Sequence, residues 1–330
     1  MGTGEARGGE TRSVAAGWLG RSSLVLAVLT LHAVAFAVAW LLDATTWYAV
    51  FALASAAALG YVASDGPFGA AAAALGAVLL VAVGLPLATF VARQEPSVVA
   101  EKALDPEVHR MLYLTVYAPL LAALVTLVFG TPLAYLLSRG FAGDSLVQSL
   151  VDLPLVVPHS VAGLLILFGF GQGAAFEFLP VLGTVPGMVL ALTFVSAPFA
   201  VNVVREGFDA VDRRLEYAAR IHGASRWETF RRVDLPLVKR AMLTGGVMAW
   251  ARSVSEFGAV AVVAYNVEFF YPVAGETVTG QHAPVFIFNT YTSGSLPESS
   301  AVGFILLTMS VAIFLLVRWV AGDTSVGVGS

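Results

Sequence analysis

The chain has 330 residues, of which 58% are hydrophobic and only 12% are charged, with a net charge of −4 and a mean hydropathy of +0.82. Soluble globular proteins carry about 25% charged residues, so this composition excludes them and places the chain in a membrane. The sequence contains no cysteine, which excludes disulfides, thiolate metal ligands and thiol catalysis.

Eight apolar stretches are long enough to cross a bilayer, since a helix needs roughly 20 residues to span about 30 Å of hydrocarbon. They cover approximately residues 24–42, 47–63, 69–92, 112–137, 149–170, 186–204, 241–264 and 300–320. The sequence therefore predicts an all-α integral membrane protein with about eight transmembrane helices. With the N-terminus inside, 14 of the 18 Lys and Arg fall on the cytoplasmic side, so we expect a multi-pass plasma-membrane protein with both termini cytoplasmic.

The order of polar and apolar segments predicts four parts: a polar cytoplasmic tail at 1–22, an accessory transmembrane hairpin at 23–66, a core at 67–322 and a second cytoplasmic tail at 323–330. Nothing in the first two spans is polar enough to handle a solute. The core includes a basic cytoplasmic loop at 205–240 and an aromatic outer segment at 265–299. Three prolines and a short apolar run make this outer segment a candidate re-entrant or surface structure, with an ordinary loop as the alternative.

The fifth span contains "VDLPLVVPHSVAG", with Pro154 and Pro158 four residues apart and His159 and Ser160 directly after them. Two prolines in one turn free backbone carbonyls, which are tolerated at membrane depth only inside protein or beside water. This stretch is therefore predicted to face a translocation pathway. The alternative is a kinked packing helix in which His159 is satisfied by neighbours.

The loop at 205–240 holds nine of the 18 cations. Its apolar residues recur every three or four positions, at Leu215, Ala219, Gly223, Trp227, Phe230 and Val233. We expect two short helices with a turn at Gly223, the second ended by Pro236 because proline lacks the next backbone N–H. A basic amphipathic segment held against anionic lipid would show the same periodicity.

The seventh span contains "WARSVSEFGAV", in which Arg252 and Glu256 are four residues apart on one helical face, with Ser255 between them. Each charge alone would cost about 2.5–3.5 kcal/mol at the bilayer centre, so pairing is expected. Two hypotheses remain open: a cation beside the path of an anion, or a structural ion pair that fixes helix packing.

The residue order of the basic loop resembles the EAA loop of ABC-transporter permeases, in which Glu-Ala-Ala is followed after three residues by Gly, and after nine more by an aliphatic residue, any residue and Leu-Pro. Here Tyr217 stands where the pattern has glutamate, and Glu216 lies beside it. The resemblance implies a coupling helix that docks on a separate ATPase. The residues that would carry it are Tyr217, Ala218, Ala219, Gly223, Ala224, Trp227, Phe230, Leu235 and Pro236.

The chain has no phosphate-binding loop, because Lys102 and Lys239 follow Glu101 and Val238 rather than the glycine that the motif requires. We therefore expect a transport subunit without enzymatic activity or cofactor of its own. ATP and magnesium would bind to the partner ATPase.

Four stretches together look like the molybdate/tungstate branch of these permeases: "GTPLAYLLSR", "VDLPLVVPHSVAG", "GASRWETFRRVDLPL" and "WARSVSEFGAV". The likeness covers about residues 69–320 and implies a type I ABC importer core of about six helices, preceded by a two-helix extension. It also implies a homodimer with two ATPase subunits and an extracytoplasmic oxyanion-binding protein. The candidate pathway or gate residues are Pro154, Pro158, His159, Ser160, Arg252, Ser255 and Glu256.

The chemistry of the predicted core suits a tetrahedral oxyanion, which prefers hydroxyls, amides and helix N-termini. Such groups are supplied by Ser160, Thr193, Ser196, Asn202, Ser253 and Ser255. A permease for sulfate or another oxyanion is one alternative. A secondary transporter using Asp152, His159, Arg252 and Glu256 as a proton relay is another, although "LPLVVP" has no second copy in the chain. No metal-site or nucleic-acid-binding motif is present.

Overall fold

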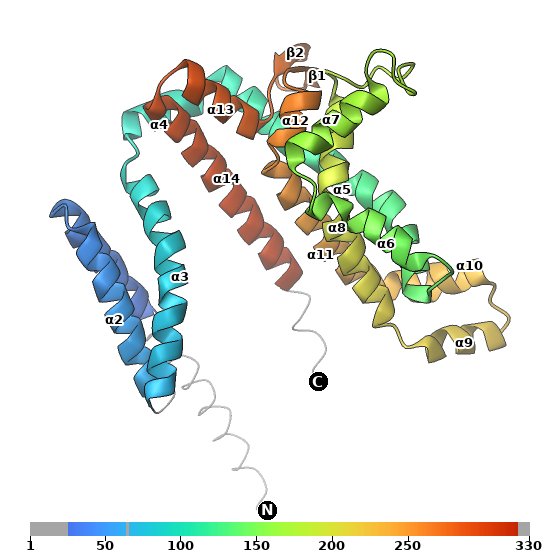
Figure 1. Cartoon of the computed structure of the whole chain (residues 1–330), viewed down its shortest axis with the longest axis horizontal. Coiled ribbons are helices and arrows are strands. Elements are labelled where there is room, and N and C mark those ends of the chain that lie inside the picture. The colour runs from blue at the N-terminus through green and yellow to red at the C-terminus, as the bar shows by residue number, and fades with distance from the viewer. Residues whose placement is uncertain (1–25, 64–65, 323–330) are drawn as a thin grey trace, which may run out of the picture. The chain divides into compact units, whose positions relative to one another are not determined.

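The computed structural model describes residues 26–63 and 66–322, with side chains described as far as residue 315 in the last helix. The described residues are mostly helical, with one short hairpin, which confirms the expected all-α membrane fold (Figure 1). The chain divides into two compact units, one within residues 1–93 and the other within residues 94–330.

The first unit contains a helix at Leu26–Leu41, α2 (Thr45–Ala63) and α3 (Pro67–Ala92). Small residues let α2 and α3 approach closely, because a Cβ at Gly60 would lie only 2.4 Å from the Gly69 carbonyl oxygen. The unit therefore holds one helix more than the expected hairpin, and its boundary follows α3 instead of preceding it. The two predicted tails, 1–22 and 323–330, lie outside the described residues.

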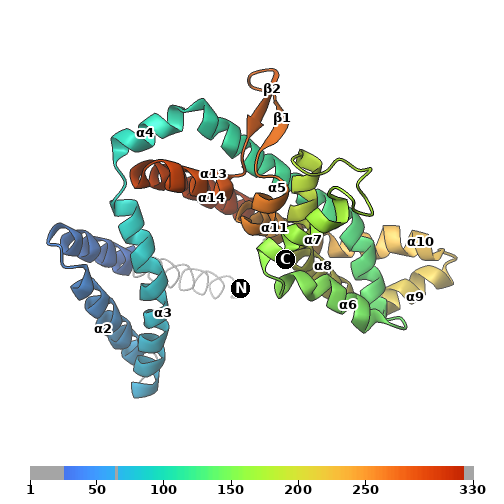
Figure 2. The same ribbon diagram turned by 45° about the horizontal axis from the view of Figure 1, so that its top comes forward.

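The second unit begins with α4 (Pro96–Leu104) and continues through α5 (Pro106–Arg139), α6 (Asp144–Asp152), the 3-10 turn η1 (Leu153–Leu155), α7 (His159–Phe170), α8 (Val185–Asp209), α9 (Arg213–Ile221), α10 (Arg226–Thr229), the π-turn η2 (Phe230–Asp234), α11 (Leu235–Val254), α12 (Gly258–Val263), β1 (Val267–Tyr271), β2 (Glu276–Gly280), α13 (Ala283–Ser293) and α14 (Leu296–Gly322). Helices α5, α8 and α11 pack on one another at its centre (Figure 2). Their buried contacts include Ala123, Ala200 and Ala249, one from each helix.

Five helices of the described chain are long and apolar enough to cross a membrane: α2, α3, α5, α8 and the Leu296–Leu315 part of α14. Two expected spans are broken instead. The stretch 149–170 bends by 114° between η1 and α7, and 241–264 is interrupted between α11 and α12. The break in the first stretch agrees with the disruption expected from its two prolines, whereas the interruption of the second was not expected. In the first case Pro154 and Pro158 remove backbone donors, so the chain ends one helix and starts another.

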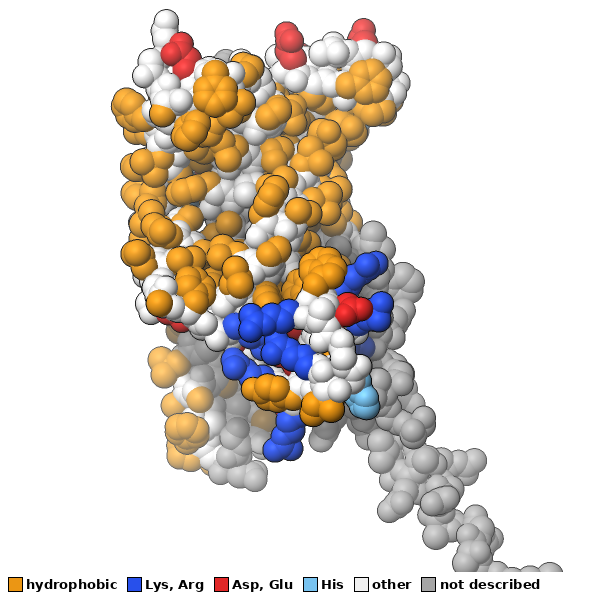
Figure 3. Space-filling model, turned by 90° about the vertical axis from the view of Figure 1, so that its right-hand side faces the viewer, with side chains coloured by type: hydrophobic (Ala, Val, Ile, Leu, Met, Phe, Trp, Pro, Cys, Tyr) orange, Lys and Arg blue, Asp and Glu red, His pale blue; other side chains and the backbone are white. Residues whose placement is uncertain are grey.

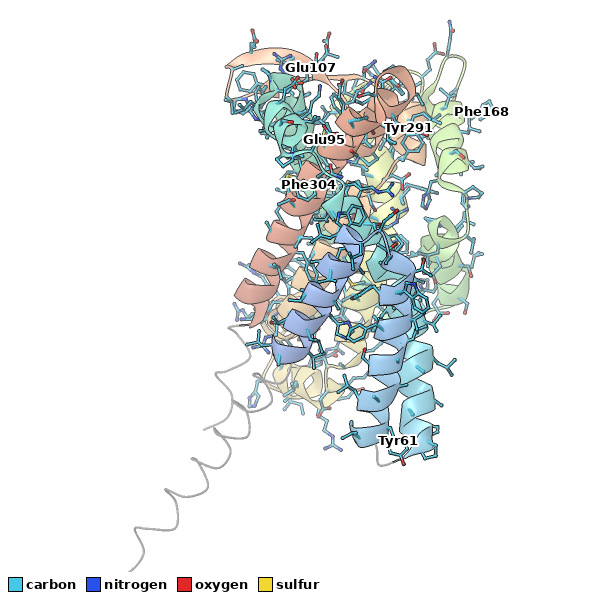
Figure 4. All side chains as sticks on the ribbon, turned by 90° about the vertical axis from the view of Figure 1, so that its left-hand side faces the viewer. Tyr61, Glu95, Glu107, Phe168, Tyr291 and Phe304 are labelled. Carbon is cyan, nitrogen blue, oxygen red and sulfur yellow. The ribbon has the colours of Figure 1, made fainter. Side chains whose placement is uncertain are left out.

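The segment 265–299, expected to be surface or re-entrant structure, forms an antiparallel hairpin followed by α13. Strand β1 pairs with β2 in the register Val267 to Gly280, and Gly275 closes the turn with φ +70°. Glu107 and Tyr291 mark the same end of this unit as the hairpin, and Phe304 lies further along α14 (Figure 4). His282, which precedes α13, is fully buried under the hairpin end of the unit.

Burial lowers the pKa of His282 to about 4, from a usual value of 6.5. A lowered pKa means that the stability contributed by the neutral ring is present above pH 6.5 and is lost as the pH falls toward 4. Thermal melting of the detergent-solubilised protein should therefore show a loss of up to about 3 kcal/mol across this range. His282→Gln should melt earlier at pH 7 but flatten the profile, whereas the exposed His222→Gln should leave it unchanged; an unchanged profile in His282→Gln would contradict this assignment.

Candidate functional site

The two helix breaks meet at one cavity of about 730 Å³ in the second unit. Its walls come from η1, α7, α8, α11 and the start of α12, and the lining residues are Pro154, Leu155, His159, Ser160, Val195, Phe199, Arg252, Ser255, Phe257 and Gly258. Five of the seven predicted pathway residues are thus brought together. Pro158 instead precedes α7 as its N-cap, and Glu256 lies behind the cavity wall.

Glycine makes the junction between the two broken helices possible. A Cβ at Gly258 would lie 2.9 Å from the Ser160 backbone nitrogen, and one at Gly163 would lie 2.7 Å from the Val262 Cβ. Larger residues at either position would push α12 away from α7. The first turn of α7, with its unpaired N–H groups, is consequently held at the cavity wall.

Arg252 is the cation of this cavity, and three side chains hold it. Its Nη2 lies 2.9 Å from Glu256 Oε2 and donates to His159 Nε2 at 2.7 Å, and its Nη1 donates to Ser255 at 3.3 Å. Glu256 is fully buried, and its second oxygen accepts the Ala259 N–H at 2.9 Å. The carboxylate is therefore hidden while Arg252 and His159, with side chains 18% and 45% exposed, remain at the surface of the cavity.

The other predicted polar residues of the core divide into two groups. The hydroxyls of Thr193, Ser196 and Ser253 are buried, with no hydrogen-bond partner among the described residues. Asn202 instead joins a network in which its amide donates to Asp152 at 2.8 Å and Gln148 donates to both, at 2.8 and 2.7 Å. Gln148 was missed by sequence reasoning. Its position four residues before Asp152 on one helical face was the signal that could have found it.

The basic loop has the two short helices expected from its periodicity. Asp212 caps α9 by accepting the Arg214 N–H at 2.9 Å, and Ser225 and Glu228 form a reciprocal capping box on α10. Between them Gly223 has φ +91°, a left-handed conformation that residues with a Cβ rarely adopt. These three local signals fix the turn at the predicted glycine.

Pro236 does not end the second helix, and that prediction was wrong. The chain stays helical through η2 into α11, where Pro236 occupies the first turn. The physical reason is the π-helix at Phe230–Asp234. Its wider hydrogen-bond spacing, from residue i to i+5, accommodates a following residue that lacks a backbone N–H and relieves the clash between the proline ring and the preceding turn. Leu235 and Pro236 thus join the loop to the core without a break.

The loop exposes several apolar side chains among its cations and buries three polar ones. Tyr217, Ile221 and Trp227 are 60%, 84% and 65% exposed, whereas Glu216, Thr229 and Asp234 are buried. Ala218 is exposed, and Ala219, Ala224 and Phe230 are half-buried. Lys and Arg side chains gather at this end of the molecule, below a band of apolar side chains (Figure 3). An exposed aromatic surface ringed by cations is typical of a protein-binding site.

A groove of about 650 Å³ runs along this surface between α5 and the loop. It is lined by Pro132, Tyr135, Leu136, Arg139, Arg213, Glu216, Tyr217, Arg220, Arg226, Trp227 and Phe230. Phe230 is its aromatic floor, with ring centroids 4.9 Å from Tyr135 and 5.8 Å from Trp227. The groove could therefore accept an apolar side chain at its base and an acidic one at its rim.

Comparison with known proteins identifies relatives over most of the chain. The family described as binding-protein-dependent transport system inner membrane component matches residues 126–324. The molybdate/tungstate transport system permease protein WtpB of Thermococcus kodakarensis is 37% identical over 253 residues, covering 76% of this chain and 94% of the relative. A probable sulfate transport system permease of Chlorella vulgaris is 32% identical, covering 67% and 82%. A bacterial ABC transporter that imports alginate shares the fold, with a TM-score of 0.55 at 15% identity over 74% of this chain and 91% of the other.

Proposed function

Because the chain belongs to the family of binding-protein-dependent transport system inner membrane components, we propose that it is the permease subunit of an ATP-driven importer of tetrahedral oxyanions, with molybdate or tungstate as its substrate. The observation that carries the proposal is the position of Arg252. It lines the cavity where both broken helices meet, while its carboxylate partner is buried away from that cavity.

The cavity offers an oxyanion the contacts that it requires. The Arg252 guanidinium presents forked donors and Ser160 and Ser255 present hydroxyls. His159 and Ser160 begin α7 and line the same space, so the positive end of this helix lies beside it. Broken helices whose N-termini point at an anionic substrate are a recurring arrangement in transporters. A carboxylate at the cavity surface would repel the anion, and Glu256 is kept out of it.

The loop at 205–240 is the proposed contact with a separate ATPase subunit that binds ATP and magnesium. Two copies of this chain would each engage one ATPase, and ATP binding would draw the two loops together and rock the halves of the dimer. Tyr217 is exposed and uncharged, so this position would contribute aromatic contact in place of the usual carboxylate. The cations at this end support a cytoplasmic location for the loop, and the hairpin end would then face the extracytoplasmic binding protein.

Sulfate is the second candidate substrate, because a probable sulfate permease is 32% identical to the chain. The deciding experiment is reconstitution of this chain with its ATPase and its binding protein in liposomes. ATP hydrolysis and uptake are then measured against tungstate, molybdate, sulfate and phosphate. We expect stimulation by tungstate or molybdate. Stimulation by sulfate alone would retain the architecture and change the substrate, whereas uptake driven by a proton gradient without ATP would overturn the proposal.

A further inference from the structure

Three charged residues from separate elements meet in the interior of the basic loop. Arg139 is the last residue of α5, Glu216 lies in α9, and Asp234 is the last residue of the π-turn η2. Arg139 Nη2 is 2.7 Å from Glu216 Oε1 and 3.7 Å from Asp234 Oδ1. All three are largely buried, with side chains 18%, 11% and 0% exposed.

The two ion pairs differ in what they connect. Asp234 is continuous with α11, so its contact joins the end of α5 to the start of a helix that already packs against α5. Glu216 belongs to α9, which bears the exposed Tyr217 and Ile221. The Arg139–Glu216 ion pair is thus the close charged contact between α9 and α5, and beside it Arg213 donates a hydrogen bond to the Ser138 carbonyl at 3.3 Å.

Arg139 also connects to the floor of the groove. Its guanidinium lies 4.8 Å from the centre of the Tyr135 ring, and that ring packs edge-on against Phe230. A displacement of α9 or α10 would therefore act on the last turn of α5 through both an ion pair and an aromatic contact. The core end of α5 packs against α8 and α11, which line the cavity.

From this geometry we infer that Glu216 is a positioning residue for energy coupling: through Arg139 it transmits movement of the ATPase-binding loop to helix α5. The inference rests on the proposed function. It also explains why the carboxylate of this loop can be at Glu216, one position before the glutamate of the EAA pattern, which would be at Tyr217. Glu216 points inward to its own chain, and the side chain offered to the partner at the next position is an uncharged tyrosine.

The cluster supplies a charge-matched control, because it contains two carboxylates and one guanidinium. Glu216→Gln and Asp234→Asn each remove one negative charge, and each leaves Arg139 with one buried partner. Neither variant leaves a lone buried charge, the condition that makes removal of an ion-pair partner strongly destabilising. Only Glu216→Gln removes the ion pair between α5 and α9.

The experiment measures oxyanion transported per ATP hydrolysed in the reconstituted complex. We expect Glu216→Gln to co-purify with the ATPase and hydrolyse ATP while this ratio falls about tenfold, since coupling between two close charges contributes about 1.5 kcal/mol or more. Asp234→Asn should keep the normal ratio. Equal losses in both variants, an unchanged ratio in Glu216→Gln, or loss of ATPase binding in that variant would each overturn the inference. If the wild-type complex is not stimulated by any oxyanion, the proposed function fails instead.

The buried position of Asp234 should also make the thermal stability of the protein depend on pH. Burial raises the pKa of this carboxyl, the negative charge of Glu216 adds to the effect, and Arg139 and Arg220 oppose it. A raised pKa means that the stability associated with the protonated acid is present below pH about 4 and is lost as the pH rises through the raised value. Asp234→Asn should consequently melt at a higher temperature than the wild type at pH 7, with the difference shrinking as the pH falls; a lower melting temperature at pH 7 would contradict this.

Discussion

Replacing Arg252 with glutamine is expected to reduce oxyanion-stimulated ATP hydrolysis and uptake by about 30-fold or more. The guanidinium is the cation at the surface of the cavity, and loss of a desolvated charged contact costs about 2 kcal/mol or more. The substitution also leaves Glu256 fully buried without its cation, so the single variant is expected to lose stability as well. Transport measured on this variant alone would not separate the two effects.

The double variant Arg252→Gln with Glu256→Gln separates them. It removes both charges from the buried pair, so folding should recover in a melting assay while transport stays low. A structural ion pair would behave differently, because the neutral pair would then transport normally. Arg252→Lys, which keeps the charge but loses the forked donors, should fall between the wild type and the double variant. Normal uptake by the double variant would contradict a role for Arg252 in the anion path.

The membrane helices were predictable because each is a long apolar run. The expected stretches 112–137, 186–204 and 300–320 all lie within observed helices. In two spans hydropathy continues across a backbone break. In 149–170 the two prolines indicated the break but not its angle of 114°. In 241–264 the interruption at residues 255–257 contains no proline or glycine that could have signalled it. The nearest glycine, Gly258, already belongs to α12.

The candidate site was predictable as a set of residues but not as a geometry. The i, i+4 spacing of Arg252 and Glu256 placed them on one helical face, and the structure joins them at 2.9 Å. Tertiary packing decides that the Arg252 side chain, and not that of Glu256, faces the cavity, because it hides Glu256 beneath α12. The contact of Arg252 with His159, 93 residues away, is a consequence of the two breaks meeting and has no local sequence signal.

In the basic loop, periodicity predicted the helices but did not reveal which side chains are buried. An apolar stripe normally marks the buried face of a helix, whereas here Trp227 and Leu215 are exposed and Asp234 is fully buried. The reversal follows from the surroundings of the loop: its inner face meets Arg139 at the end of α5, which favours carboxylates. The outer face presents apolar side chains within a ring of cations, as expected of a surface that another protein covers.

Gly223→Val should leave membrane insertion intact and weaken binding of the ATPase subunit by about tenfold or more. The cause is the backbone and not crowding, since no atom lies within 4 Å of the position of an added Cβ, while φ is +91°. A β-branched residue in this conformation costs about 1–3 kcal/mol, so the loop would leave the docking conformation for most of the time. Apparent affinity falls with the fraction of molecules that remain competent, and 1.4 kcal/mol corresponds to tenfold.

The chain provides a matched control at Gly275, in the turn of the hairpin. It has φ +70° and no atom within 4 Å of an added Cβ, so Gly275→Val imposes a similar backbone strain at the opposite end of the unit (Figure 1). Co-purification with the ATPase should fall in Gly223→Val and persist in Gly275→Val. Gly223→Asn should retain much of the binding, because asparagine tolerates positive φ better than valine does. If both valine variants lose the ATPase equally, general destabilisation accounts for the loss and the loop is not the specific contact.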